Sequence, residues 1–273
     1  MAYIYTMNIV RAAMIGDIVG SSGLETLEAR LPALIKEHGL NLVTVNGENA
    51  AEGFGITERE YRRIIQAGAD VVTSGNHVWE KREFWPFLES EKNLLRPANY
   101  PADAPGAGFA GIEKDGVNWI VVNLQGRDFI SAIDCPFLCF DNIANTPSAM
   151  PSAMPRIIIV DFHAESSREK EAFAYYADGR ASLVAGTHTH VQTADERILP
   201  KGSAYITDIG MTGITDSVIG MDIKICQDRF RKQVQYQMKP AVSAEHGQLQ
   251  GVIAEIDADT GTAVSVKRIA LRS

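Results

Sequence analysis

The chain has 273 residues, of which 45% are hydrophobic, and a formal net charge of −8. This length and apolar content suit one sizeable core, and because no linker divides the sequence we expect a single domain over residues 1–273. The acidic balance excludes a strong sequence-independent grip on duplex nucleic acid, and no apolar run approaches the roughly 20 residues of a membrane span.

The first part of the chain alternates predicted strands and helices. An apolar run at Ile9–Ile15 predicts a strand, and the glycine-rich residues 16–23 predict a loop. Leu24–His38 predicts a helix that ends at Gly39, a residue suited to the left-handed position after a helix. Pro32 indicates a kink or a break inside that helix.

The same alternation continues through the next two strands. Leu40–Val45 predicts a strand, and Thr57–Gln66 predicts a helix that begins with a capping box of Thr57 and Glu60. Asp70–Thr73 predicts the following strand. Three strand-helix-strand steps favour a largely parallel sheet, in which ligands gather beyond the carboxyl ends of the strands.

The middle of the chain has a different pattern. Phe109–Glu113 and Val117–Leu124 flank Lys114–Gly116, a turn signal that is typical of an antiparallel hairpin. Residues 125–155 are expected to form an irregular loop. The tandem Ser-Ala-Met-Pro at residues 148–155 is too short to be a structural repeat.

The second half returns to strands that end in polar residues. Arg156–His163 predicts a buried strand, followed by a capping box of Ser166 and Glu169, and Ser182–Ala185 predicts another strand. Further strands are expected at Ala204–Ile206, Val252–Ile256 and Ala263–Ile269, the last two as an antiparallel pair. A parallel set followed by hairpin strands predicts two mixed sheets packed face to face, with helices outside.

The cysteines and the N-terminal segment indicate the compartment. Cys135, Cys139 and Cys226 form no disulfide framework, and residues 1–7 lack the basic flank and cleavage site of a signal peptide. We therefore expect reduced thiols and a cytoplasmic protein. Cys135 and Cys139 are four residues apart without a second cysteine pair, so a zinc role is not expected for them.

Seven polar side chains follow the predicted strand ends and form the candidate metal ligands. They are Asp17, Glu48, Asn49, Asn76, His163, His188 and His190. The His-x-His pair alone is as compatible with an ordinary polar loop as with a metal site, so its weight comes from the other strand ends. A nitrogen and oxygen set without thiolates favours manganese, iron or zinc over calcium.

Seven ligands are too many for one catalytic ion. If Glu48 bridges, two ions about 3.5 to 4 Å apart could share the set, as in two-metal hydrolases. A water between the two ions would be deprotonated near neutral pH, and the paired cations would neutralise two phosphoryl oxygens. A phosphoester is therefore the natural substrate, even for an acidic protein.

Hydrolysis also needs a proton for the departing oxygen. His77 follows the candidate ligand Asn76, and its unperturbed pKa near 6.5 suits a general acid at neutral pH. The alternative is a turn histidine that packs on Trp79.

Five motifs resemble, in chain order, those of calcineurin-like metallophosphoesterases. They are Asp17, Gly47-Glu48-Asn49, Gly75-Asn76-His77, His163 and Gly186-Thr187-His188-Thr189-His190. Two departures are visible: Val19 stands where the usual first motif has a histidine, and Glu48 stands where the usual bridging residue is an aspartate. With these changes and the strings VNGENAAEGFGIT, SGNHVWEK, VDFHAE and DIGMTG, nearly the whole chain resembles the YmdB-like bacterial branch.

The resemblance implies a four-layer α/β/β/α sandwich, a di-iron or di-manganese centre, and phosphodiesterase activity that includes 2',3'-cyclic nucleotides, with a metal-bridging hydroxide and His77 as acid. It implies that Asn49 fills the place of the histidine missing at Val19. It also implies that one ion is held by Asp17, Glu48, Asn49 and His190, and the other by Glu48, Asn76, His163 and His188.

Other interpretations remain open at this point. The chain could be a regulatory scaffold that keeps its metals and acts through a protein or RNA partner, an interpretation that Val19 supports and His77 opposes. A homo-oligomer is compatible with the sequence. Glu165 and Asp208 could accept hydrogen bonds from ligand imidazoles or lie in solvent. His246 is expected in a turn, and Trp79, Phe84 and Trp85 either line a base pocket or belong to the core.

Overall fold

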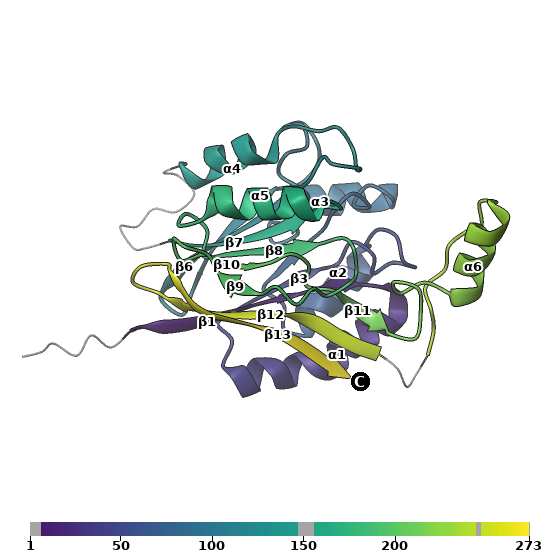
Figure 1. Cartoon of the computed structure of the whole chain (residues 1–273), viewed down its shortest axis with the longest axis horizontal. Coiled ribbons are helices and arrows are strands. Elements are labelled where there is room, and N and C mark those ends of the chain that lie inside the picture. Colours follow the sequence, from purple (N-terminus) through teal and green to yellow (C-terminus); the bar gives the residue numbers. More distant parts are fainter. Residues whose placement is uncertain (1–6, 147–155, 244–246, 273) are drawn as a thin grey trace, which may run out of the picture.

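Two β-sheets pack face to face, and helices cover the outer face of each sheet (Figure 1). The structure, a computed structural model, describes residues 7–146, 156–243 and 247–272. Two features considered in the sequence, the tandem Ser-Ala-Met-Pro at 148–155 and the turn at His246, lie outside the described residues.

The first sheet has seven strands and is mixed. Across the sheet they are β2 (Asp17–Ile18), β11 (Met211–Ile214), β12 (Gly247–Asp257), β1 (Ile9–Ile15), β3 (Leu42–Asn46) and β4 (Val71–Thr73), with β13 (Ala263–Arg272) paired to β12. β1, β3 and β4 are parallel neighbours, so their carboxyl ends meet at one edge. β12 and β13 form the predicted antiparallel pair.

The second sheet has six strands and is also mixed. Across the sheet they are β5 (Phe109–Lys114), β6 (Val117–Gln125), β7 (Arg156–His163), β8 (Leu183–Thr187), β10 (Ala204–Ile206) and β9 (Arg197–Ile198). The predicted hairpin joins β5 and β6, and its turn residues Asp115 and Gly116 have φ of 53° and 72°. β6, β7 and β8 are parallel, so a second set of carboxyl ends is aligned.

The helices complete the four layers. The first sheet is covered by α1 (Gly20–His38), α2 (Glu58–Gln66), the 3-10 helix η1 (Arg82–Phe84) and α3 (Trp85–Ser90), and the second by α4 (Pro136–Ala144) and α5 (Ser167–Ala177). In Figure 1, α4 and α5 lie above the second sheet and α1 lies below the first. The predicted α/β/β/α sandwich of two mixed sheets is confirmed.

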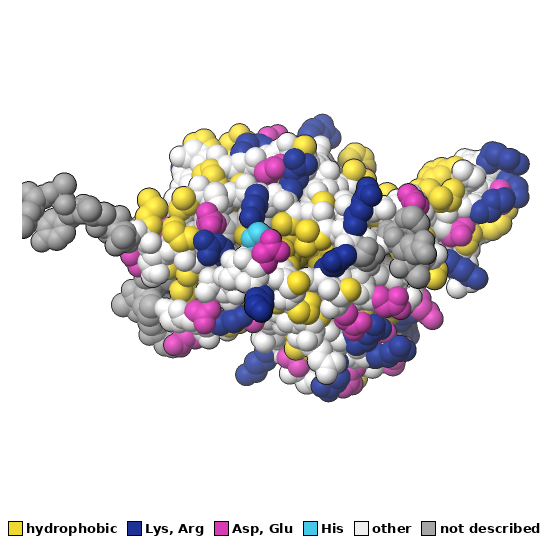
Figure 2. Space-filling model, turned by 90° about the horizontal axis from the view of Figure 1, so that it is seen from below, with side chains coloured by type: hydrophobic (Ala, Val, Ile, Leu, Met, Phe, Trp, Pro, Cys, Tyr) yellow, Lys and Arg dark blue, Asp and Glu magenta, His cyan; other side chains and the backbone are white. Residues whose placement is uncertain are grey.

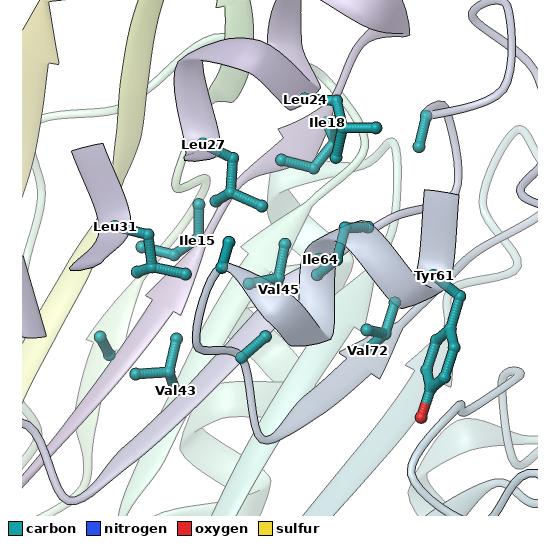
Figure 3. Close-up of a cluster of buried hydrophobic side chains, with 14 of the residues drawn as sticks. Ile15, Ile18, Leu24, Leu27, Leu31, Val43, Val45, Tyr61, Ile64 and Val72 are labelled. Carbon is teal, nitrogen blue, oxygen red and sulfur yellow. The ribbon is translucent and has the colours of Figure 1, made fainter. Parts of the chain in front are cut away.

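Three apolar clusters hold these layers together. Figure 3 shows the outer cluster of the first sheet, in which leucines of α1 and Ile64 of α2 pack on the strands. A second cluster fills the space between the sheets, with Met14, Val121 and Ile159 among its members. The third lies under α4 and α5 and includes Phe140 and Phe173. Alternate residues of each strand therefore face different layers.

Of the kink or break expected at Pro32, the break is wrong, because α1 runs without interruption from Gly20 to His38. Pro32 lies on the exposed face, while the helix buries a stripe of leucines on the first sheet. Burying each leucine contributes about 1.5–3 kcal/mol, which together exceeds the roughly 3 kcal/mol cost of a proline inside a helix.

Two further boundaries differ from the prediction. α1 begins at Gly20 rather than Leu24, and its first turn lies so close to β11 that a Cβ on Gly23 would be 2.3 Å from the Thr212 carbonyl oxygen. The expected loop at 125–155 contains α4, which begins at Pro136, because proline suits the first turn of a helix.

A last helix, α6 (Ile223–Lys232), stands away from the four layers (Figure 1). Figure 2 shows the same projecting end with a group of Lys and Arg side chains. Its apolar residues Ile223, Cys226 and Phe230 recur at helical spacing, but of these only Cys226 is buried. Within the part of the chain that the structure describes, no helix has both the length and the apolar character needed to cross a membrane.

Candidate metal centre

The seven candidate ligands lie at the carboxyl ends of strands from both sheets. They lie on β2 (Asp17), after β3 (Glu48, Asn49), after β4 (Asn76), at the end of β7 (His163) and after β8 (His188, His190). Five of the side chains are buried, and those of Asn76 and His188 are half-buried. The fold therefore brings together residues from five separate stretches of the sequence.

The fully buried His163 is at the centre of one group. Its Nε2 lies 3.1 Å from Glu48 Oε1, 3.1 Å from Asn76 Oδ1 and 3.0 Å from His188 Nδ1. Ligand atoms of Glu48, His163 and His188 all lie within 4.8 Å of one another, a spacing that can hold a metal ion.

Glu48 connects this group to a second one. Its Oε1 accepts a hydrogen bond from Asn49 Nδ2 at 3.3 Å, and the same amide nitrogen lies 3.1 Å from His190 Nε2. The carboxylate of Glu48 therefore touches both groups, and it is the residue best placed to be shared by two ions.

Asp17 lies beside both groups. Its Oδ2 accepts a hydrogen bond from the His188 backbone N–H at 3.2 Å, and its Oδ1 lies 3.9 Å from His163 Nδ1. Among the described residues, neither this Oδ1 nor the buried Asn49 Oδ1 has a hydrogen-bond partner. Two buried acceptors without donors are costly, which makes a cation at the site favourable.

In each of the three imidazoles, the ring nitrogen that points away from the cluster (the outer nitrogen) faces an acceptor, and the other (the inner nitrogen) faces the cluster. The contacts are His163 Nδ1 to the Thr187 hydroxyl (2.9 Å), His188 Nε2 to Glu165 Oε2 (3.3 Å) and His190 Nδ1 to the Ile219 carbonyl (2.8 Å). A ring whose outer nitrogen donates its proton presents a lone pair on the inner nitrogen. All three inner nitrogens therefore suit metal binding.

The donor set fits transition-metal ions. The inward atoms are imidazole nitrogens, carboxylate oxygens and amide oxygens, without a thiolate, a combination that suits manganese, iron or zinc. Val19, where the usual histidine is missing, packs instead in an apolar cluster with Met211, Met221 and Cys226.

Burial and mutual interaction shift the pKa values of four candidate ligands. Burial disfavours ionisation of both His163 and Glu48, but their mutual attraction raises the pKa of His163 to about 9 and lowers that of Glu48 to about 2. Burial raises the pKa of Asp17 to about 7, although nearby imidazoles oppose this rise. Burial and the charge of His163 lower the pKa of His188 to about 3. A proton on His163 therefore occupies the place that suits a cation.

Gly75 makes room for the cluster. A Cβ at this position would lie 2.2 Å from His163 Nε2 and 2.4 Å from Glu48 Oε2. Because such contacts are too short, any larger residue would force these two side chains apart from their present positions. Its role is visible only once the fold is known.

His77 lies at the rim of the site with its side chain 26% exposed. Its backbone N–H donates to Glu48 Oε2 at 3.2 Å, and its Nδ1 lies 3.2 Å from Glu80 Oε1. The ring packs edge-on against Phe54, with 5.0 Å between ring centroids, whereas Trp79 packs on Trp85 and Tyr100. The imidazole is therefore close to the metal ligands but outside their cluster.

The other predicted neighbours have different surroundings. Glu165 contacts His188, as considered from the sequence. Asp208 is neither in solvent nor against an imidazole: it is buried, pairs with Lys170 Nζ at 2.7 Å and accepts from the Thr189 hydroxyl at 2.8 Å. It thereby holds the loop that carries His188. Phe84 is buried in the core, on the side of the first sheet that α1 and α2 cover.

Sequence reasoning missed Asp161 and Thr187, which lie directly beneath His163. Asp161 is buried and accepts a hydrogen bond from the Thr187 hydroxyl at 2.6 Å. The sequence did contain a signal for Asp161, because a carboxylate two residues before a strand-end histidine lies on the same side of the strand as that histidine.

Comparison with known proteins agrees with this geometry. A family model described as YmdB-like protein matches residues 13–269. The 2',3'-cyclic-nucleotide 2'-phosphodiesterase of Bacillus subtilis (strain 168) is 45% identical over 261 residues, which cover 95% of this chain and 96% of that protein. The resemblance inferred from the motifs is confirmed.

Two crystal structures have the same fold. A protein from Thermus thermophilus superposes with a TM-score of 0.89 and 37% identity, covering 97% of this chain and 100% of that chain. A phosphatase from Mycoplasma pneumoniae superposes with a TM-score of 0.88 and 32% identity, covering 98% of this chain and 95% of that chain.

Proposed function

Because this chain belongs to the YmdB-like family, we propose that it is a dinuclear metal-dependent phosphodiesterase. The observation that carries the proposal is the position of Glu48, whose carboxylate touches two groups of ligand side chains at once. That position supports a bridging carboxylate between two ions.

We propose the division of ligands that the motif resemblance implies. One ion would be held by Asp17, Glu48, Asn49 and His190, and the other by Glu48, Asn76, His163 and His188. When bound, the two ions supply an activated water and neutralise the phosphoryl oxygens. Manganese or iron suits this donor set, and zinc is compatible with it.

His77 is the proposed general acid. Its contact with Glu80 occupies Nδ1 and leaves the Nε2 edge for the leaving oxygen, while Phe54 restricts the tilt of the ring. The proton would be held at Nε2 and given to the oxygen as the phosphorus–oxygen bond breaks.

The proposed substrates are small phosphodiesters, including 2',3'-cyclic nucleotides. The activity in the name of the Bacillus subtilis relative supports this class. The free thiols of Cys135, Cys139 and Cys226 agree with the cytoplasm as the proposed compartment. The scaffold alternative gains no specific support, since His77 and its partner Glu80 are both in place.

The test compares two substrates that need an acid to different degrees. His77→Ala should reduce kcat for 2',3'-cyclic AMP, whose leaving group is an alkoxide, by about 10²- to 10⁴-fold. The loss for bis-p-nitrophenyl phosphate, which has a better leaving group, should be smaller. His38→Ala is the matched control, because His38 has a similar side-chain exposure of 24% and lies at the end of α1.

Metal content should be unchanged in both variants. Equal losses for the two substrates would remove His77 from the role of acid. A wild-type protein that binds two ions but hydrolyses neither substrate would refute the proposed function.

A further inference from the structure

A chain of buried polar groups leads from the metal centre into the space between the two sheets. His163 Nδ1 lies 2.9 Å from Thr187 Oγ1, which lies 2.6 Å from Asp161 Oδ1. His163 and Thr187 are direct partners on the neighbouring strands β7 and β8. All three side chains are fully buried, so water cannot replace these contacts.

The direction of the hydrogen bonds in this chain is fixed by chemistry. Asp161 lies among three donors, the Asn46 amide and the hydroxyls of Thr73 and Thr187, so its oxygens accept and the single proton of the Thr187 hydroxyl points to Asp161. The hydroxyl oxygen is then left to accept from His163 Nδ1–H. Nδ1 therefore keeps its proton, and Nε2, which faces Glu48, Asn76 and His188, is the nitrogen left to bind a metal ion.

The far end of the chain is anchored in the other sheet. Asp161 Oδ2 accepts from Asn46 Nδ2 of β3 at 3.0 Å and from Thr73 Oγ1 of β4 at 2.5 Å. Asn46 and Thr73 are themselves partners in the first sheet. One carboxylate thus receives donors from both sheets, directly beneath the candidate ligands.

We propose that Asp161 is a positioning residue: acting through Thr187, it fixes the His163 imidazole with its proton on Nδ1 and its Nε2 lone pair toward the metal centre. This inference rests on the proposed function, because it assigns His163 to a metal ion. Neither Asp161 nor Thr187 is among the seven candidate ligands.

Asp161→Asn distinguishes positioning from simple packing, because it keeps the volume of the side chain. Asn46 and Thr73 are donors, so the new amide should place its oxygen toward them and its NH₂ toward Thr187. The Thr187 hydroxyl would then accept from the amide and donate to His163 Nδ1. The proton of His163 would move to Nε2, the atom that faces the ligands.

The Mn²⁺ affinity of the full chain, measured by titration calorimetry, is the first readout. We expect both Asp161→Asn and Thr187→Val to weaken the binding of one ion by about 10- to 100-fold. Thr187→Ser keeps the hydroxyl and should restore wild-type affinity. Thr44→Val is the matched control, since Thr44 is also buried on β3 and its hydroxyl has no partner in the described part of the chain.

Wild-type affinity in both Asp161→Asn and Thr187→Val would overturn the inference. So would an equal loss in Thr44→Val, because it would indicate a general effect of the core. Thermal unfolding identifies any variant that fails to fold. If Thr187→Val does not fold, Asp161→Asn compared with Thr44→Val still distinguishes positioning of His163 from a packing effect.

The second readout is the position of the imidazole proton, followed by ¹⁵N NMR of the Zn²⁺-loaded protein. The wild type should show the His163 proton on Nδ1, in slow exchange with water, and Thr187→Val should lose that slow exchange. A protein that binds metal but hydrolyses no phosphoester would refute the proposed function. The Mn²⁺ affinity and the position of the His163 proton would still test the role of Asp161. A wild type that binds no metal would refute both proposals.

Discussion

Gly75 offers a test of the cluster geometry through a residue that carries no ligand atom. In Gly75→Ala the new methyl group would lie 2.2 Å from His163 Nε2 and 2.4 Å from Glu48 Oε2. Ordinary carbon contacts are about 3.5–4.0 Å, so the two side chains must separate from the methyl group by more than about 1 Å. Metal sites tolerate deviations of only about 0.2 Å in ligand distance. We therefore expect the variant to lose bound metal and at least about 10²-fold in turnover.

The assay is elemental analysis of the purified variant together with initial rates on 2',3'-cyclic AMP. Gly213→Ala is the control, because its methyl group would meet its nearest atom, Val19 Cβ, at 3.3 Å, a contact that a small shift relieves. Thermal unfolding should show that both variants fold. A Gly75→Ala protein with a full pair of ions and a wild-type rate would refute the placement of Glu48 and His163 around this glycine.

Three further predictions follow from the same contacts. Glu48→Gln should reduce the metal content from about two ions per chain to one or none, whereas His190→Ala should weaken mainly one ion, and a full pair in Glu48→Gln would exclude the bridging role. Because the metal-free pKa of His163 is about 9, an ion must displace its proton below that pH, so Mn²⁺ affinity should rise with pH and level off above about 9. Calorimetry in buffers of different ionisation enthalpy should detect the released proton, and pH-independent affinity would contradict the assignment. Lys170→Met should lower the free energy of unfolding in urea by about 3–5 kcal/mol, because it leaves the buried Asp208 carboxylate unpaired, and an unchanged midpoint would contradict this.

The sequence predicted the parts of the fold that depend on local apolar patterns. β1 and β7 have the expected boundaries, because runs such as Arg156–His163 are apolar and end in polar residues. The pattern failed where tertiary contacts decide the structure. α1 continues through Pro32 because its leucine stripe is buried on the first sheet, whereas α6 projects from the layers and buries only Cys226.

The candidate ligands could be found from the sequence because each follows a strand end, where parallel strands bring their carboxyl ends together. The residues that orient them could not be found in this way. Thr187 gains its meaning from lying opposite His163 across two strands, and Gly75 from a steric gap that only the fold creates. Hydrogen-bond direction and close approach depend on pairs of residues that are distant in sequence.

The arrangement of ligands connects metal binding to the packing of the two sheets. Glu48 and Asn76 extend from the first sheet, whereas His163 and His188 extend from the second, so an ion held by all four binds only when the sheets are correctly aligned. Anything that binds only the folded state stabilises it, so metal affinity and sheet packing must strengthen each other. Asp161 accepts hydrogen bonds from both sheets directly beneath the site. A change in sheet packing that displaces Asp161 should therefore change the metal affinity.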